Sequence, residues 1–127
     1  MKIKMSNIVN LQDVYDKIKT QSLPITTTYK ISKLFNAIKN EQEFYSTQLD
    51  AIIQQYGKKD ENGNFIRTEN GDGIQVDNAN IKEVESKLNE LWKIEVELPD
   101  ITFTLNELEK INLSVEEFNN FLPFIED

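Results

Sequence analysis

The most restrictive feature of this sequence is a heptad pattern of apolar residues within residues 28–56. Apolar side chains recur every seven positions, at Ile31, Ile38, Tyr45 and Ile52. This spacing is typical of a helix that packs one face against another helix. The predicted helix is about 43 Å long, whereas a compact chain of this length has a diameter of about 36 Å. The helix must therefore bend or protrude.

A second amphipathic helix is predicted at residues 80–93. Its apolar residues follow three-four-three spacing, at Ile81, Val84, Leu88 and Leu91. This spacing places them on one helical face, which the seam of the first helix could cover. We therefore expect an antiparallel helical hairpin.

All four glycines lie between these two helices, at positions 57, 63, 71 and 73. We predict that Gly57 ends the first helix in a left-handed conformation and that Gly63 serves a turn in "DENGN". Gly71 and Gly73 would close a β-hairpin over residues 64–77, between the strand-like segments "NFIRT" and "GIQVD". The spacing of acids and glycines does not fit a calcium loop or a phosphate-binding loop.

Three segments begin with a residue that can cap a helix and carry an acidic residue three positions later. The pairs are Asn10 with Asp13, Thr104 with Glu107, and Ser114 with Glu117. Such pairs satisfy amide donors at a helix start, so they predict helices at about 11–20, 105–112 and 115–122. Residues 94–103 alternate in polarity around Pro99, which predicts a short or edge strand that pairs with the hairpin.

These elements predict a fold that is mainly α with a small β element (α+β). We expect a single domain over residues 1–127, with the long helix at 28–56, the β-hairpin at 64–77, the second helix at 80–93 and acidic helices within 104–125. The aromatic tail is interpreted first as core, and alternatively as a docking helix for another subunit. Its candidate interaction residues, beside the four of the heptad seam, are Phe118, Phe121, Leu122 and Phe124.

Charge is divided unevenly along the chain. Residues 1–59 carry nine lysines against five acids (+4), and residues 60–127 carry five basic residues against seventeen acids (−12). The simplest interpretation is solubility; the alternatives are head-to-tail association or an acidic face for a basic partner. Direct nucleic-acid binding is not expected, because the lysine excess is small and Arg67 is the only arginine.

The composition also limits the chemistry. The chain has no histidine and no cysteine, which excludes histidine-based triads, thiol nucleophiles and the usual zinc ligands. No spacing singles out a pair of carboxylates. We therefore predict a protein that is not an enzyme, with no catalytic residue, cofactor or metal. No segment approaches the ~20 apolar residues of a membrane span, so no membrane association is expected.

Four segments together resemble small phage and prophage proteins of low-GC bacteria. They are "YKISKLFNAIKNEQEFYSTQLDAIIQQYG", "KKDENGNF", "VESKLNELWKIEVEL" and "LNELEKINLSVEEFNNFLPFIE". The resemblance implies a protein of viral or prophage origin, found in the bacterial cytoplasm during infection or in the virion, without a catalytic residue.

Two classes of function follow as hypotheses. The first is a virion structural or assembly component that contacts a phage or host protein and can form homo-oligomers. The alternative is a small acidic inhibitor of a host defence system that mimics nucleic-acid charge. Its candidate acidic residues are Glu83, Glu85, Glu90, Glu95, Glu97, Glu107, Glu109, Glu116 and Glu117.

Overall fold

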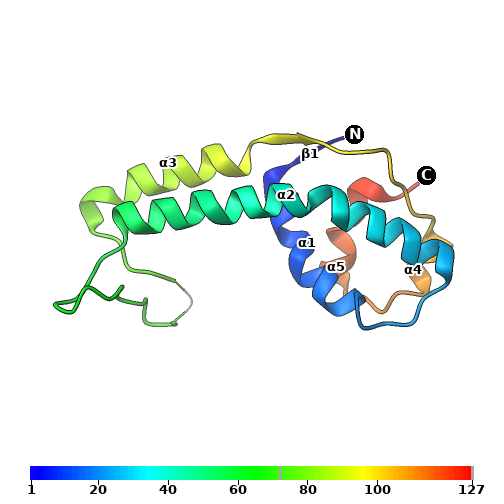
Figure 1. The fold of residues 1–127 in the computed structure, drawn as a ribbon, viewed down its shortest axis with the longest axis horizontal. Helices are drawn as coiled ribbons and strands as arrows, with labels where there is room; N and C mark the ends of the chain where they lie inside the picture. The colour runs from blue at the N-terminus through cyan, green and yellow to red at the C-terminus, as the bar shows by residue number, and fades with distance from the viewer. Residues whose placement is uncertain (72, 127) are drawn as a thin grey trace.

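The computed structural model describes residues 1–71 and 73–126 and is mainly α with a small antiparallel sheet (Figure 1). The helices are α1 (Met5–Ile18), α2 (Ile25–Tyr56), α3 (Ile81–Trp92), α4 (Leu105–Glu109) and α5 (Val115–Asn119). The sheet pairs β1 (Lys2–Lys4) with β2 (Glu95–Glu97), and two short 3-10 helices are η1 (Asn78–Asn80) and η2 (Leu122–Phe124). This confirms the predicted fold class.

Helix α2 organises the molecule. Its 32 residues correspond to about 48 Å, and it runs along the longest axis in Figure 1. It begins at Ile25, three residues before the predicted start, because Pro24 occupies the N-cap position and its fixed φ suits the beginning of a helix. The first half of α2 lies against α1 and the second half lies beside α3, so the long helix protrudes, as one of the two predicted alternatives required.

The compact part of the molecule, here called the head, comprises residues 1–43 and 95–126. Its core joins β1, α1, the first half of α2 and the chain that follows α3. Helix α1, helix α2 and the segment after α3 contribute completely buried side chains to this core. They are Met5, Ile8, Leu11, Leu34, Ile38, Phe103, Phe121 and Phe124. The aromatic residues of the C-terminal segment stack edge to face, with 5.7 Å between the ring centres of Phe103 and Phe121.

Helix α1 corrects one predicted helix start. It begins at Met5 and ends at Ile18, so Asn10 lies inside the helix and does not cap it. The buried side chains of Met5, Ile8 and Leu11 carry the apolar periodicity through this position, and burial of that face outweighs the capping preference of an asparagine.

The sheet corrects a second prediction. Strand β2 pairs antiparallel with β1, with Ile3 opposite Val96, and not with the hairpin of residues 64–77. The hairpin lies at the far end of the helices from β2 (Figure 1), whereas β1 leads directly into α1 and brings its unpaired backbone groups to β2. Ile3 and Val96 are both buried, so the pairing closes one side of the head core.

The two predicted caps in the C-terminal region are confirmed. The Thr104 hydroxyl accepts from the amide of Glu107, the Ser114 hydroxyl accepts from the amide of Glu117, and both acids return a bond to the cap backbone. Helices α4 and α5 are shorter than predicted. The chain turns back after each, and the Phe103 amide donates to the Phe124 carbonyl at 2.7 Å, which draws the last residues into the core.

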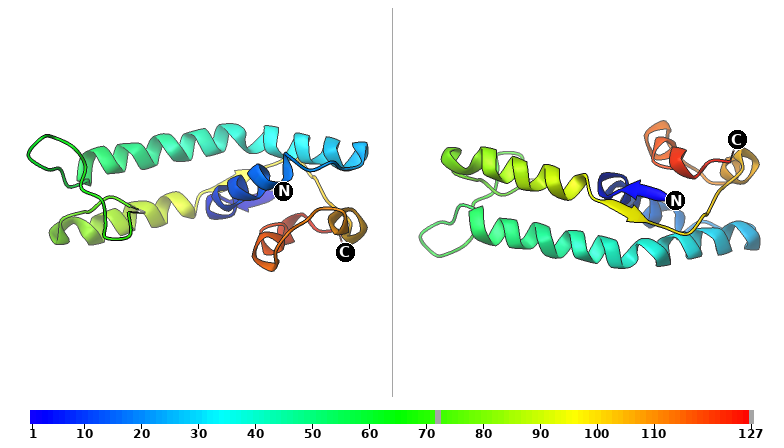
Figure 2. Two further views of the ribbon diagram at one scale, coloured as in Figure 1. Left: turned by 90° about the horizontal axis from the view of Figure 1, so that it is seen from below. Right: turned by 90° about the horizontal axis from the view of Figure 1, so that it is seen from above.

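The remaining part of the molecule, residues 44–94, is here called the stalk. It consists of the second half of α2, the loop that follows, and α3, and it extends from the head in all three views (Figures 1 and 2). The two helices lie side by side along its length, which is the predicted antiparallel hairpin. Both chain ends lie on the head side (Figure 1).

The stalk loop folds into three extended segments that hydrogen-bond in a cycle. The Lys58 amide donates to the Gln75 carbonyl, the Gln75 amide to the Ile66 carbonyl, and the Ile66 amide to the Lys58 carbonyl, all at 2.7 to 2.8 Å. Residues 64–71 and 73–77 fold back antiparallel as predicted, with Arg67 opposite Ile74, but these described residues pair through isolated bridges and form no regular strand.

The glycines of the loop divide into two kinds. Gly63 and Gly71 have φ values of +83° and +73°, which confirms their predicted turns. Gly57 does not adopt the predicted left-handed conformation, because its φ is −64°. A glycine is required at this position for steric reasons instead. A Cβ there would lie 2.5 Å from the Ile53 carbonyl oxygen and 2.8 Å from the Phe65 ring.

Candidate interaction surface

The apolar side chains of the stalk are only partly covered. Among the described residues, Leu91 is the only buried apolar residue of the stalk, whereas the head contains all the others. Large apolar side chains of the stalk retain more than a third of their area in solvent: Phe44 (43%), Ile81 (38%), Trp92 (38%) and Ile94 (37%). A hairpin of two helices offers each helix one neighbour, so it cannot bury an apolar face on both sides.

One side of the stalk carries a groove between α2 and α3, here called the stalk groove. Its hollow has a volume of about 480 Å³ and is lined by Phe44, Gln48, Ala51, Ile52, Gln55, Lys87, Glu90, Leu91 and Ile94. Four of the α2 residues are spaced four, three and four positions apart and so form one stripe along the helix: Phe44, Gln48, Ala51 and Gln55. The view from above in Figure 2 shows α2 and α3 side by side, with the loop behind them.

The α2 side of this groove carries no charge. Residues 44–56 contain a single charged residue, Asp50, in a chain in which 28% of residues are charged. Asp50 lines the hollow on the other side of the stalk and not the groove. Loss of charge from an exposed helical face is typical of the centre of a protein–protein interface.

The other side of the stalk is partly covered by its own loop. A hollow of about 610 Å³ lies between the helices and the loop, with apolar walls from Ile53, Val84 and Leu88 on the helices and Phe65 and Ile74 on the loop. These loop side chains are half-buried. The loop therefore serves as the packing partner of this face and leaves the stalk groove as the open one.

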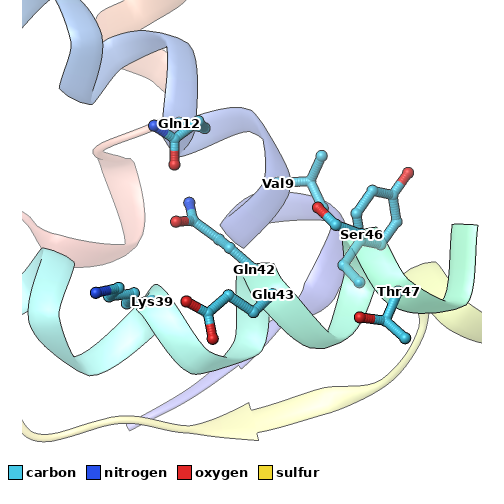
Figure 3. A pocket seen from close by; sticks show the side chains of 8 residues that line it. Val9, Gln12, Lys39, Gln42, Glu43, Ser46 and Thr47 are labelled. Carbon is cyan, nitrogen blue, oxygen red and sulfur yellow. The ribbon is translucent and has the colours of Figure 1, made fainter. Parts of the chain in front are cut away.

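A third hollow lies where α1 meets α2 (Figure 3). Most of the residues that line it have polar side chains, Gln12, Lys39, Gln42 and Glu43 among them. The Gln42 side-chain amide donates to the Ile8 carbonyl at 3.3 Å and fastens α2 to α1. Nearby, the Trp92 indole donates to the Tyr45 hydroxyl at 3.2 Å and fastens the end of α3 to α2. The first bond therefore fixes α2 to α1 within the head, and the second fixes α3 to α2 within the stalk.

The structure separates the eight predicted interaction residues into two groups. Ile31, Ile38, Phe121 and Phe124 are buried in the head core, so a partner could not contact their side chains. Their packing role is the one that the structure shows.

The other four predicted residues are accessible. Tyr45 and Ile52 lie half-buried in the stalk, Phe118 lies half-buried against the head core, and Leu122 is exposed. Of the eight, only Ile52 lines the stalk groove. Sequence reasoning missed Phe44, Ala51 and Ile94 as groove residues, although residues 44–56 contain Asp50 as their single charged residue.

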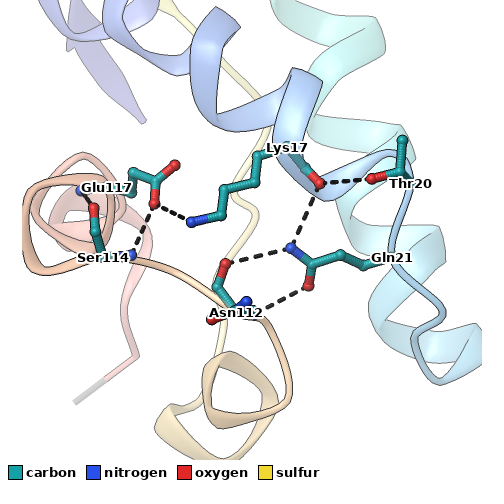
Figure 4. A network of polar contacts seen from close by, with 6 residues as sticks. All are labelled: Lys17, Thr20, Gln21, Asn112, Ser114 and Glu117. Carbon is teal, nitrogen blue, oxygen red and sulfur yellow. Dashed lines mark hydrogen bonds and ion pairs between the residues drawn. The ribbon is translucent and has the colours of Figure 1, made fainter.

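Several acidic residues have structural partners. The Lys17 ammonium lies 2.7 Å from Glu117 and the Ser114 amide also donates to it, which together lower the pKa of Glu117 to about 2 (Figure 4). Lys30 lies 2.8 Å from Glu107, and with the Thr104 amide it lowers the pKa of that carboxyl. The N-terminal ammonium lies 3.2 Å from Glu97, and this contact raises the pKa of the ammonium.

Within the stalk, an acid joins the two helices. The Tyr56 hydroxyl donates to Glu83 at 2.7 Å, and this bond raises the pKa of Tyr56. Within residues 1–71 and 73–126, no three carboxylates come together in a group that could hold a metal ion. In the same part of the chain, no helix has the length and apolar character that crossing a membrane requires.

Searches against protein-family models, curated proteins and solved structures found no match to this chain.

Proposed function

We propose that this protein is not an enzyme and acts through protein–protein contacts made by the stalk, as a structural or assembly component of a phage particle. The observation that carries the proposal is the stalk groove: an exposed helical face with apolar residues and no charge on its α2 side. The sequence resemblance supports the phage setting, and it implies a location in the bacterial cytoplasm during infection or in the virion.

The division between head and stalk supports this role. The head has a continuous apolar core of its own, although Ile25, Tyr29, Leu105, Val115 and Leu122 are exposed on its surface. The stalk holds its open face away from the head, on a helix that continues without a break from the head core. Such an arrangement presents a contact surface at a fixed position relative to a folded body.

The alternative function, an acidic inhibitor that mimics nucleic-acid charge, has less support. Of its candidate acidic residues, Glu97, Glu107 and Glu117 form ion pairs with basic groups of the same chain, and Glu83 accepts from Tyr56. A mimic of phosphate charge needs acids that are free to meet a basic partner. These four have structural partners instead.

Site-specific photocrosslinking tests the proposal. A photoreactive amino acid replaces Ala51 in the stalk groove or, as a control, Asn36, which is exposed on the same helix within the head. Each variant is irradiated as purified protein and in an extract of the bacterium that carries the gene. We expect a discrete protein adduct from position 51 and none from position 36. No adduct from position 51 in either mixture would contradict the proposal.

A further inference from the structure

We propose that the occupant of the stalk groove is a second copy of this chain. The two stalks would pair antiparallel about a two-fold axis, groove against groove, so that α2 and α3 of both copies form a four-helix arrangement. This inference rests on the proposed function and names the partner of the same surface.

The neutrality of the groove permits self-association. The chain has a net charge of −8, so two copies repel one another overall. The groove itself adds little to this repulsion, because its α2 stripe consists of Phe44, Gln48, Ala51 and Gln55, and α3 adds one charge of each sign. Two copies can therefore meet at this face with little repulsion.

The charges on α3 are complementary to themselves in this arrangement. Lys87 and Glu90 both line the groove, one helical turn apart. Among the described residues, neither takes part in an ion pair; the Lys87 ammonium lies 5.8 Å from the Tyr56 ring. In a two-fold interface, if residue i of one copy contacts residue j of the other, then residue j of the first copy contacts residue i of the second. Lys87 of each copy would thus face Glu90 of the other, giving two ion pairs.

The apolar residues of the groove suit close helix packing. Phe44 and Ile94 are exposed in the single chain, and the small Ala51 side chain allows the axes of facing helices to approach to about 8–10 Å. The α2 stripe and α3 each extend over roughly 18 Å, so two helices side by side give a footprint of about 18 by 20 Å. This footprint, about 360 Å² per copy, lies below the ~800 Å² per partner of a standard specific interface, so we expect a weak association that must be measured over a wide concentration range.

Light scattering and sedimentation over concentrations from about 1 to about 300 µM test the inference. We expect a mass that rises from 14.8 kDa toward twice that value. Ala51→Glu places a buried charge in the interface and should weaken association by about tenfold or more. Ser46→Glu is the matched control, because Ser46 is exposed on α2 and lines a different hollow. It should associate as the unmodified chain does.

A charge exchange tests the geometry of the pair. Lys87→Glu and Glu90→Lys each place like charges opposite one another and should weaken the dimer by about fivefold or more. The double variant Lys87→Glu, Glu90→Lys restores opposite charges and should recover most of the affinity. Circular dichroism of each variant verifies that the helices are intact. Failure of the double variant to recover, with its helices intact, would overturn the antiparallel pairing.

Other results overturn the self-association itself. A chain that remains at the monomer mass at every concentration would exclude it, and so would a dimer that Ala51→Glu does not weaken. A photocrosslinked adduct from position 51 that forms only in the extract, with another protein, would then leave the proposed function standing and refute the second copy as the partner. No adduct in either mixture would refute both.

Discussion

At the scale of single residues, Glu117 connects the C-terminal segment of the head to helix α1. Its carboxylate accepts from Lys17 at the end of α1 and from the amide of Ser114 at the start of α5 (Figure 4). Beside it, the Gln21 side chain both donates to and accepts from the backbone of Asn112. These contacts hold the C-terminal segment against α1.

The lowered pKa of Glu117 predicts a pH dependence of stability. Its folded pKa of about 2 lies below its ordinary value. A carboxyl with a depressed folded pKa contributes stability above its unfolded pKa and loses that contribution as pH falls through the folded pKa. The free energy of unfolding should therefore decrease as pH falls from about 4.5 to about 2.

Denaturant unfolding at several pH values measures this effect. Glu117→Gln should remove part of the decrease between these two pH values, because glutamine does not titrate. Glu116→Gln is the control, since Glu116 is an exposed neighbour on the same helix with no resolved ion pair in the described chain. Equal pH profiles for the unmodified chain and Glu117→Gln would contradict the assignment.

Gly57 offers a second residue-scale prediction. Since an added Cβ would collide with the Ile53 carbonyl and the Phe65 ring, Gly57→Ala should lower the stability of the stalk by about 1–3 kcal/mol. Gly73→Ala is the matched control. The closest atom to a Cβ there is 3.7 Å away, so its effect should lie within about 0.5 kcal/mol. Fluorescence of the single tryptophan, Trp92, in the stalk reports the unfolding. Equal stabilities of the two variants would exclude a steric role.

At the scale of elements, sequence patterns predicted the structure correctly where the interacting residues lie close together in the sequence. The boxes at Thr104 and Ser114 join residues only three positions apart, so their pattern predicted them correctly. The glycine turns at Gly63 and Gly71 are equally local. In contrast, β1 pairs residues more than ninety positions apart through the three-residue segment "KIK". Such a short strand has too little pattern to be recognised.

The heptad seam shows a second limit of sequence reasoning. Its spacing correctly predicted a long helix, but spacing alone does not say which partner covers each part. Ile31 and Ile38 pack into the head core, while Ile52 lies in the stalk beside α3. The open groove was not predicted, because which face of α2 remains uncovered depends on where the loop and α3 lie.

Capping gives a prediction for one element. Thr104→Ala removes the hydroxyl that accepts from the Glu107 amide and should cost about 1 kcal/mol of stability. Asn10→Ala is the comparison, since Asn10 lies exposed in the interior of α1. There alanine is the better helix former, so the change should be neutral or slightly stabilising. Both values come from denaturant unfolding. A larger loss of stability from Asn10→Ala than from Thr104→Ala would indicate that Asn10 caps a helix after all.

At the scale of the whole molecule, burial is distributed very unevenly. The head contains one continuous apolar core. Among the described residues of the stalk, Leu91 is the only buried apolar one. The stability of a segment follows from the apolar area that it buries. The stalk should therefore open more easily than the head, unless another protein covers its groove.

Amide hydrogen exchange, resolved by segment on the dilute protein, tests whether the stalk opens more easily than the head. We predict that amides of α1 and of residues 31–38 exchange only through global unfolding. Amides of α3 and of residues 44–56 should exchange through openings that require less free energy. Equal protection of α3 and α1 in the dilute protein would contradict the account, because it would show that the stalk is stabilised as strongly as the head without a partner.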